Sequence, residues 1–248
     1  MSSGYDVRKG ASAYAPIVGG IGGFVVTAVV LVFEIASSRH GDPPALLGHA
    51  TSLLVLGLIS CLLGAFAFGA IGAEQKPTAA LPAASLYAGS ATAIGAVAIM
   101  AAFEALATLY LQDTKPLFAL ITAGTAISSA VLVALVLGDA HISAPSGHWL
   151  NDQKRAYRAA KIASAAVFLP LAGGAILYFM DIRIAVGEAA THWFVGAGIV
   201  LSMLGGLGSM FRTMHVNDGG TKSLSKIEAF LVLGCLVLYL LALVLFLP

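Results

Sequence analysis

Seven apolar runs, each long enough to cross a lipid bilayer, constrain this chain more than any other feature of its sequence. The hydrocarbon core of a bilayer is about 30 Å thick, so a crossing helix needs about 20 apolar residues. The runs lie at residues 15–37, 46–73, 83–111, 117–139, 160–180, 192–211 and 227–247. The loops between them are short and polar, which leaves no room for a separate soluble domain. We therefore predict an all-α integral membrane protein whose single transmembrane helical domain covers residues 1–248.

Composition agrees with lipid as the main solvent of the chain. Only 10% of its residues are charged and 59% are hydrophobic, whereas soluble domains have roughly 25% charged residues. The formal net charge of +1 is uninformative about nucleic acid, but no basic stripe with interleaved aromatics appears, so no nucleic-acid partner is expected. Cys61 and Cys235 both lie inside apolar runs, which favours small core residues over a disulfide or a metal site.

The lysines and arginines predict which way the chain crosses the membrane. If the N-terminus is inside, most of the 13 basic residues fall on the cytoplasmic side, namely Arg8, Lys9, Lys76, Lys154, Arg155, Arg158, Lys161, Arg212, Lys222 and Lys226. Arg39, Lys115 and Arg183 fall outside. Cytoplasmic loops of membrane proteins are enriched in Lys and Arg. We therefore predict a multi-pass protein of a cell membrane, the cytoplasmic membrane of a bacterium, with its N-terminus inside and its C-terminus outside.

The 12 acidic residues divide evenly between the two sides, so the outer face is negative and the inner face positive. The outer acids are Glu34, Asp42, Glu104, Asp113, Asp181 and Glu188. An acidic mouth raises the local concentration of cations. The alternative is that any protein whose outer loops lack Lys and Arg shows the same imbalance without a function.

A Phe-Glu dipeptide occurs twice at matching points of two helical hairpins. The matched residues are Phe33-Glu34, Asp42 and Pro44 in the first hairpin and Phe103-Glu104, Asp113 and Pro116 in the second. A proline after each loop suits the first turn of the returning helix. A third hairpin has Asp181 at a similar place but no such proline. The pattern suggests three parallel-repeat hairpins followed by one further helix.

Glu34 and Glu104 are the candidate functional carboxylates, because an ionisable residue inside a membrane is costly unless it is paired or hydrated. In the functional interpretation, both line a hydrated vestibule near the outer surface. Two structural alternatives remain open. Each side chain lies one or two turns from a loop and can extend to the headgroups, or it can hold a neighbouring helix by a hydrogen bond.

Pro170 lies almost at the centre of the fifth run, followed by Gly173 and Gly174. Proline removes a backbone hydrogen bond and bends a helix, and a simple kink is the favoured interpretation because proline is common in membrane helices. The alternative is a discontinuous helix with exposed carbonyl groups, as in some transporters.

Small residues recur every four positions in two of the runs. Gly198, Ser202 and Gly206 lie on one face of the sixth run, and Gly19 and Gly23 on one face of the first. Such faces let helix backbones approach closely, so we predict that they serve packing.

The histidines do not predict a cofactor. The closest approach to a zinc set is His40, Asp42 and His49, whose spacing is loose, with His192 as a further weak candidate at the same side. Haem is not expected either, because His192 and His215 are 23 residues apart, about 34 Å along a helix. No metal or other cofactor is therefore predicted.

Three classes of function remain, since the chain has no HExxH, GxSxG or P-loop motif. The first is a channel or transporter for cations or protons with an acidic outer vestibule, whose candidate binding residues are Glu34, Glu104, Asp42, Asp113, Pro170 and Asp181. The second is a non-catalytic membrane subunit of a larger complex. The third is an intramembrane enzyme that acts on a lipid or isoprenoid through Glu34 or Glu104. In each class the chain lies in a lipid bilayer and forms a homo-oligomer or joins other membrane subunits.

Overall fold

The computed structural model describes residues 7–38, 44–74, 79–143, 153–180, 188–214 and 224–246, and these residues form seven long α-helices. The helices are α1 (Val7–Ser38), α2 (Ala45–Ala73), α3 (Leu81–Tyr110), α4 (Lys115–Ser143), α5 (Gln153–Phe179), α6 (Glu188–Met214) and α7 (Lys226–Phe246), with a short 3-10 helix, η1 (Gln112–Thr114), before α4. All seven are long and apolar enough to cross a membrane. The prediction of an all-α protein of the membrane class, with seven helices able to span a bilayer, is confirmed, whereas the repeat of three hairpins stays a prediction.

Two helices extend well beyond the runs predicted for them. α1 begins at Val7 rather than at residue 15, and α5 begins at Gln153 rather than at residue 160. The added turns have the sequences VRKGASAY and QKRAYRA, which are rich in polar and charged residues. Hydropathy marks only the part of a helix that lies in hydrocarbon, whereas the backbone hydrogen bonds of a helix continue into the headgroup region. The other boundaries lie within four residues of their predicted positions.

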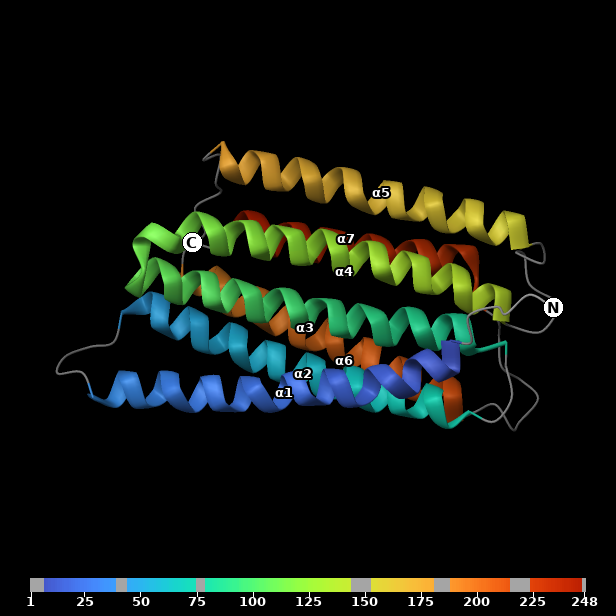
Figure 1. The fold of residues 1–248 in the computed structure, drawn as a ribbon, viewed down its shortest axis with the longest axis horizontal. Coiled ribbons are helices and arrows are strands. Elements are labelled where there is room, and N and C mark those ends of the chain that lie inside the picture. Colours follow the sequence, from blue (N-terminus) through green and yellow to red (C-terminus); the bar gives the residue numbers. More distant parts are fainter. Residues whose placement is uncertain are drawn as a thin grey trace.

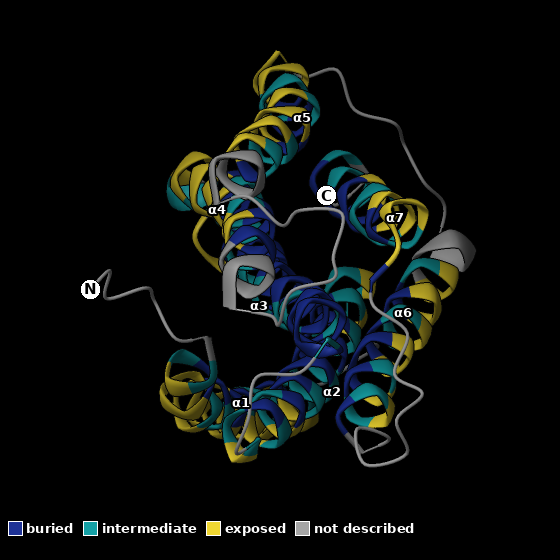
Figure 2. Ribbon diagram, turned by 90° about the vertical axis from the view of Figure 1, so that its right-hand side faces the viewer, coloured by how far each residue is buried: buried dark blue, intermediate teal, exposed yellow. Residues whose placement is uncertain are grey.

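The seven helices run roughly parallel to one common axis, and successive helices alternate in direction (Figure 1). α3 lies at the centre and packs against α2, α4, α6 and α7. α1 packs mainly against α2, and α5 packs against α4 and α7, so both lie at the periphery (Figure 2). The central position of α3 explains why most of its residues are buried by protein.

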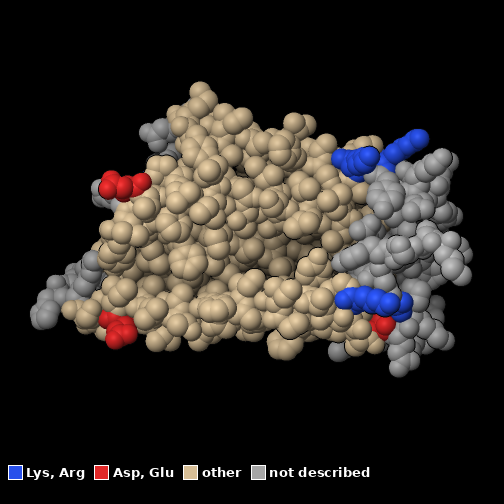
Figure 3. Space-filling view, viewed as in Figure 1, with Lys and Arg blue, Asp and Glu red and all other residues tan. Residues whose placement is uncertain are grey.

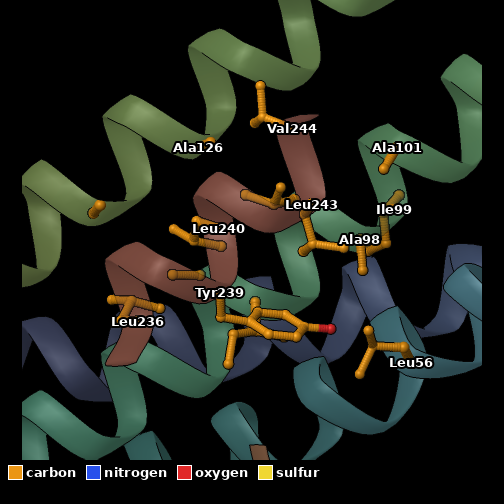
Figure 4. Close-up of a cluster of buried hydrophobic side chains, with 14 of the residues drawn as sticks. Leu56, Ala98, Ile99, Ala101, Ala126, Leu236, Tyr239, Leu240, Leu243 and Val244 are labelled. Atoms are coloured by element: carbon orange, nitrogen blue, oxygen red, sulfur yellow. The ribbon is translucent and has the colours of Figure 1, made fainter. Parts of the chain in front are cut away.

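Small residues on α3 permit this dense packing. Its buried positions are mostly Ala, Gly and Ser, which bring the neighbouring helix axes close together. Figure 4 shows where four helices meet: Tyr239 of α7 lies close to Leu56 of α2 and Ala98 of α3, and Ala126 of α4 lies nearby. The hydroxyl of Tyr239 donates a hydrogen bond of 3.1 Å to the backbone carbonyl of Phe194 in α6. The apolar core and this bond together join α7 to α6.

The small-residue face of α6 packs against α2. A Cβ atom added at Gly206 would lie 2.7 Å from the Cβ of Leu63, and the hydroxyls of Ser202 and Ser60 lie 2.7 Å apart. The predicted packing role of this face is therefore observed. The α1 face differs, because Gly19 faces Ala65 at an ordinary distance and Gly23 faces open space.

Charged side chains gather at the two ends of the bundle (Figure 3). The end at which α1 begins contains Arg8, Lys9, Arg158, Lys161, Arg212 and Lys226. We call it the basic end. The opposite end, the acidic end, presents Glu34 and Asp113 at its surface. Whether the basic end faces the cytoplasm, as the sequence predicts, stays a prediction.

Candidate functional site

Glu104 is a buried carboxylate in the central helix of the bundle. It lies six residues before the end of α3 at Tyr110, about 9 Å along the helix, in the half of the bundle nearer the acidic end. Only 3% of Glu104 is exposed. The hydroxyl of Tyr178, which is 5% exposed, donates a hydrogen bond to Glu104 Oε1. A carboxylate and a phenol hydroxyl thus meet in the apolar interior.

The helix positions explain how these two groups meet. Glu104 is flanked on α3 by the buried residues Ala101, Ala102 and Ala105, whose small side chains leave room for a partner. Tyr178 lies at the last turn of α5, which ends at Phe179. The extensive contacts of α5 among the described residues are with α4 and α7, and the long side chain of Tyr178 links this peripheral helix to the central one.

The two Phe-Glu carboxylates have different surroundings. Glu34 is exposed on α1, and Asp113 is exposed on η1. The structure therefore places Glu104 in the interior and leaves these two acids on the surface of the acidic end. Asp42 and Asp181 lie outside the described residues.

Pro170 is half-buried within α5, which runs without interruption from Gln153 to Phe179. The alternative of a discontinuous helix at this proline is therefore wrong. The helix continues through Pro170 because a proline removes only one backbone hydrogen bond, and the remaining hydrogen bonds on either side hold the helix together. Pro170 consequently offers no open stretch of backbone carbonyls to an ion.

Two of the histidines named as weak metal candidates lie within the described residues. His49 is half-buried in the first turns of α2, and His192 is exposed on α6. His40 lies outside the described residues. Within the described ranges, no group of three or more His, Cys, Asp or Glu side chains is placed to hold a metal ion.

A second polar cluster, which the sequence interpretation did not identify, lies at the basic end. Arg212 Nη2 and Glu228 Oε1 are 2.6 Å apart and form a salt bridge. The hydroxyl of Tyr87 donates a 2.8 Å hydrogen bond to the same carboxylate oxygen. Arg212 lies in the last turn of α6 and Glu228 in the first turn of α7, so a hairpin of these two helices brings the charges together. Their opposite charges on either side of one loop are the sequence feature from which this pair could have been predicted.

A groove of about 720 Å³ extends from this cluster between α6 and α7, with α3 as its floor. We call it the α6–α7 groove. Its lining includes Tyr87, Ser90 and Ile94 of α3, Leu204, Gly208 and Arg212 of α6, and Leu231 and Cys235 of α7. A smaller cavity of about 160 Å³, lined in part by Tyr14, Phe68 and Leu132, lies on the other side of α3. Neither cavity is lined by Glu34 or Glu104.

No known protein family, curated protein or solved structure matches this chain. The function proposed below therefore depends on the residues and their geometry.

Proposed function

We propose that this chain is a membrane transport protein that moves protons, alone or together with a solute, and that Glu104 binds the proton. The observation that supports this most strongly is the burial of the Glu104 carboxylate in the central helix, where it accepts a hydrogen bond from Tyr178. Intramembrane ionisable residues are expensive and mark ion pathways and proton relays. In this proposal the bilayer-spanning bundle isolates Glu104 from water until a conformational change exposes it.

A buried carboxylate such as that of Glu104 suits a proton. A carboxylate takes up one proton without further ligands, whereas a hard cation such as calcium needs six to eight oxygen atoms. The tyrosine hydroxyl can stabilise the ionised form by donating a hydrogen bond.

The peripheral position of α5 supplies a means of access to Glu104. Among the described residues, the extensive contacts of α5 are with α4 and α7. Tyr178, in the last turn of α5, contacts Glu104. A movement of this end of α5 would separate the tyrosine from the carboxylate and open the interior toward the acidic end. Protonation of Glu104 weakens its hydrogen bond from Tyr178, because a neutral carboxyl group is a poorer acceptor, and so favours that movement.

Proton flux into liposomes tests this proposal. The full chain is reconstituted with an entrapped pH-sensitive dye, and a potassium gradient with valinomycin drives proton entry. We expect flux above that of protein-free liposomes, and we expect Glu104→Gln to abolish it, because glutamine keeps the volume and the acceptor oxygen but cannot titrate. Glu34→Gln is the matched control, since Glu34 is exposed, and it should conduct like the wild type.

The flux experiment and co-purification together separate proton transport from the subunit alternative. Wild-type flux from Glu104→Gln, or no flux from the wild-type protein, would overturn the proton-transport proposal. If Glu104→Ala instead loses a co-purifying membrane protein while Glu104→Gln retains it, the chain is a structural subunit held together by Glu104. The predicted orientation is tested separately with cysteines at Ser38 and Ser225 in a Cys235→Ser background: an impermeant maleimide added outside should label the first and not the second.

A further inference from the structure

Two polar contacts join α6 and α7, one at the mouth of the α6–α7 groove and one farther along the two helices. At the basic end, Arg212 of α6 bonds Glu228 of α7, and farther along, Tyr239 of α7 bonds the backbone of Phe194 in α6. Between these two contacts α6 and α7 both rest on α3 and pack little against each other in the described residues. The groove is therefore a defined feature of the fold, open on its lateral side.

The length of the groove matches one leaflet of a bilayer. Along α6 its lining runs from Leu201 to Arg212, which is roughly 16 Å at 1.5 Å per residue. The hydrocarbon core is about 30 Å thick, so one leaflet supplies about half of that. Between the polar cluster and the Tyr239 contact the lining is almost entirely apolar, with Ser90 as the polar exception. The acyl chain of a membrane lipid has a matching length and is equally apolar.

The charges at the mouth of the groove select the headgroup. Arg212 lines the groove, and its side chain is 26% exposed. Lys226 is exposed at the start of α7, two residues before Glu228. Arg212 and Lys226 are thus two cationic side chains near this end of the groove, beside the carboxylate of Glu228. Basic pockets between transmembrane helices bind the anionic headgroups of lipids, and arginine matches the geometry of a phosphate.

We propose that the α6–α7 groove binds one anionic phospholipid, with its phosphate beside Arg212 at the basic end and an acyl chain along the groove toward Tyr239. This site is separate from Glu104, so it stands or falls independently of the proton-transport proposal. The lipid joins α6 to α7 across their open side and thereby holds the hairpin together.

Native mass spectrometry of the detergent-purified full chain tests this proposal. The protein is exposed to equimolar phosphatidylglycerol and phosphatidylcholine with identical acyl chains, and the retained lipid is identified by mass. We expect one phosphatidylglycerol per chain, retained several-fold more than phosphatidylcholine. Arg212→Gln should bring the ratio close to one. Soluble glycerol phosphate at the same concentration should not displace the lipid.

Because Arg212→Gln also removes a salt bridge, a second pair of variants leaves the polar cluster intact. Cys235 is exposed and lines the groove, whereas Leu238, also exposed on α7, does not line it. Cys235→Trp should fill the groove and lose the bound lipid, and the matched control Leu238→Trp should retain it. Equal retention of both lipids by the wild type, equal retention by the two tryptophan variants, or displacement by glycerol phosphate would each overturn the proposal.

Discussion

Glu34 on α1 and Glu104 on α3 each follow a phenylalanine in the last two turns of a helix, yet they occupy opposite environments. Glu104 is 3% exposed and accepts a hydrogen bond from Tyr178, whereas Glu34 is exposed. The difference follows from the two helices: 61% of the apolar stretch of α3 is buried in protein, against 22% of that of α1. A local sequence pattern therefore does not determine the environment of a carboxylate; the number of neighbouring helices does.

The same contrast separates the parts that these helices play. α3 contacts helices on several sides, so most of its side chains are buried against protein. α1 contacts mainly α2 and directs Ile17, Phe24 and Phe33 outward, where lipid is the natural neighbour of an apolar side chain. We expect substitutions on α3 to have much larger effects than equivalent substitutions on α1.

The largest effect is expected from truncating the two glutamates. Glu104→Ala removes the acceptor of the Tyr178 hydrogen bond and leaves a cavity in the centre of the bundle, so it should reduce the free energy of unfolding by about 2–4 kcal/mol. Glu34→Ala should change it by less than about 0.5 kcal/mol, as surface substitutions do. Unfolding in mixed micelles with increasing SDS measures both values. Equal losses would show that the two sites are equivalent after all.

A smaller effect is expected from adding one methyl group to a glycine on each helix. A Cβ atom at Gly95 of α3 would lie 3.0 Å from Cys61 Sγ and 3.2 Å from the backbone nitrogen of Cys61. Gly95→Ala should therefore destabilise the protein by about 1–2 kcal/mol, because overpacking displaces a neighbouring helix. Gly23→Ala on α1 has open space around the new methyl group and should be neutral or stabilising by up to about 1 kcal/mol. The melting temperatures of the two variants in one detergent provide the comparison. A lower melting temperature for Gly23→Ala would indicate that this face of α1 contacts protein rather than open space.

Removing a single hydroxyl gives the third comparison. Tyr178→Phe keeps the ring but deletes the donor to Glu104, which should cost about 1 kcal/mol of stability. It should also shift the pH dependence of proton flux toward higher pH, because the ionised carboxylate loses a stabilising hydrogen bond. Tyr14→Phe on α1 is the control, since Tyr14 is exposed and packs by its ring against Phe68. An unchanged pH profile in Tyr178→Phe would separate the tyrosine from the proton site.

The sequence predicted the helices far better than it predicted the sites. Hydropathy identifies a membrane helix because a span in lipid must satisfy all its backbone hydrogen bonds internally, and that requirement does not depend on the neighbouring helices. Which residue meets Glu104 does depend on them: Tyr178 is 74 positions away along the chain and on a different helix. The Arg212–Glu228 pair could have been predicted more easily from the sequence, because the two residues flank a single loop. Its link to Tyr87 depends on the packing of α3 against α6 and α7.

The smallest expected effect concerns the charge interaction between Arg8, near the start of α1, and Glu74, which follows α2. Glu74 follows the last residue of α2, and burial raises the pKa of its carboxyl group, while the charge of Arg8 opposes that shift. A carboxyl group whose pKa is raised by folding stabilises the folded state in its protonated form, and this contribution is lost as the pH rises through the folded pKa. At neutral pH the ionised Glu74 is therefore slightly unfavourable.

Glu74→Gln should accordingly raise the melting temperature slightly at pH 7 and leave it unchanged at pH 4, where the wild-type carboxyl group is largely protonated. Arg8→Gln should do the reverse at pH 7, because it removes the charge that lowers the Glu74 pKa, and the double variant should behave like Glu74→Gln alone. Melting curves of the three variants between pH 4 and pH 8 measure these differences. If Arg8→Gln has no effect when Glu74 is present, the charge of Arg8 does not influence the Glu74 carboxyl group. α1 would then be linked to the rest of the bundle even less closely, relative to α3, than the structure indicates.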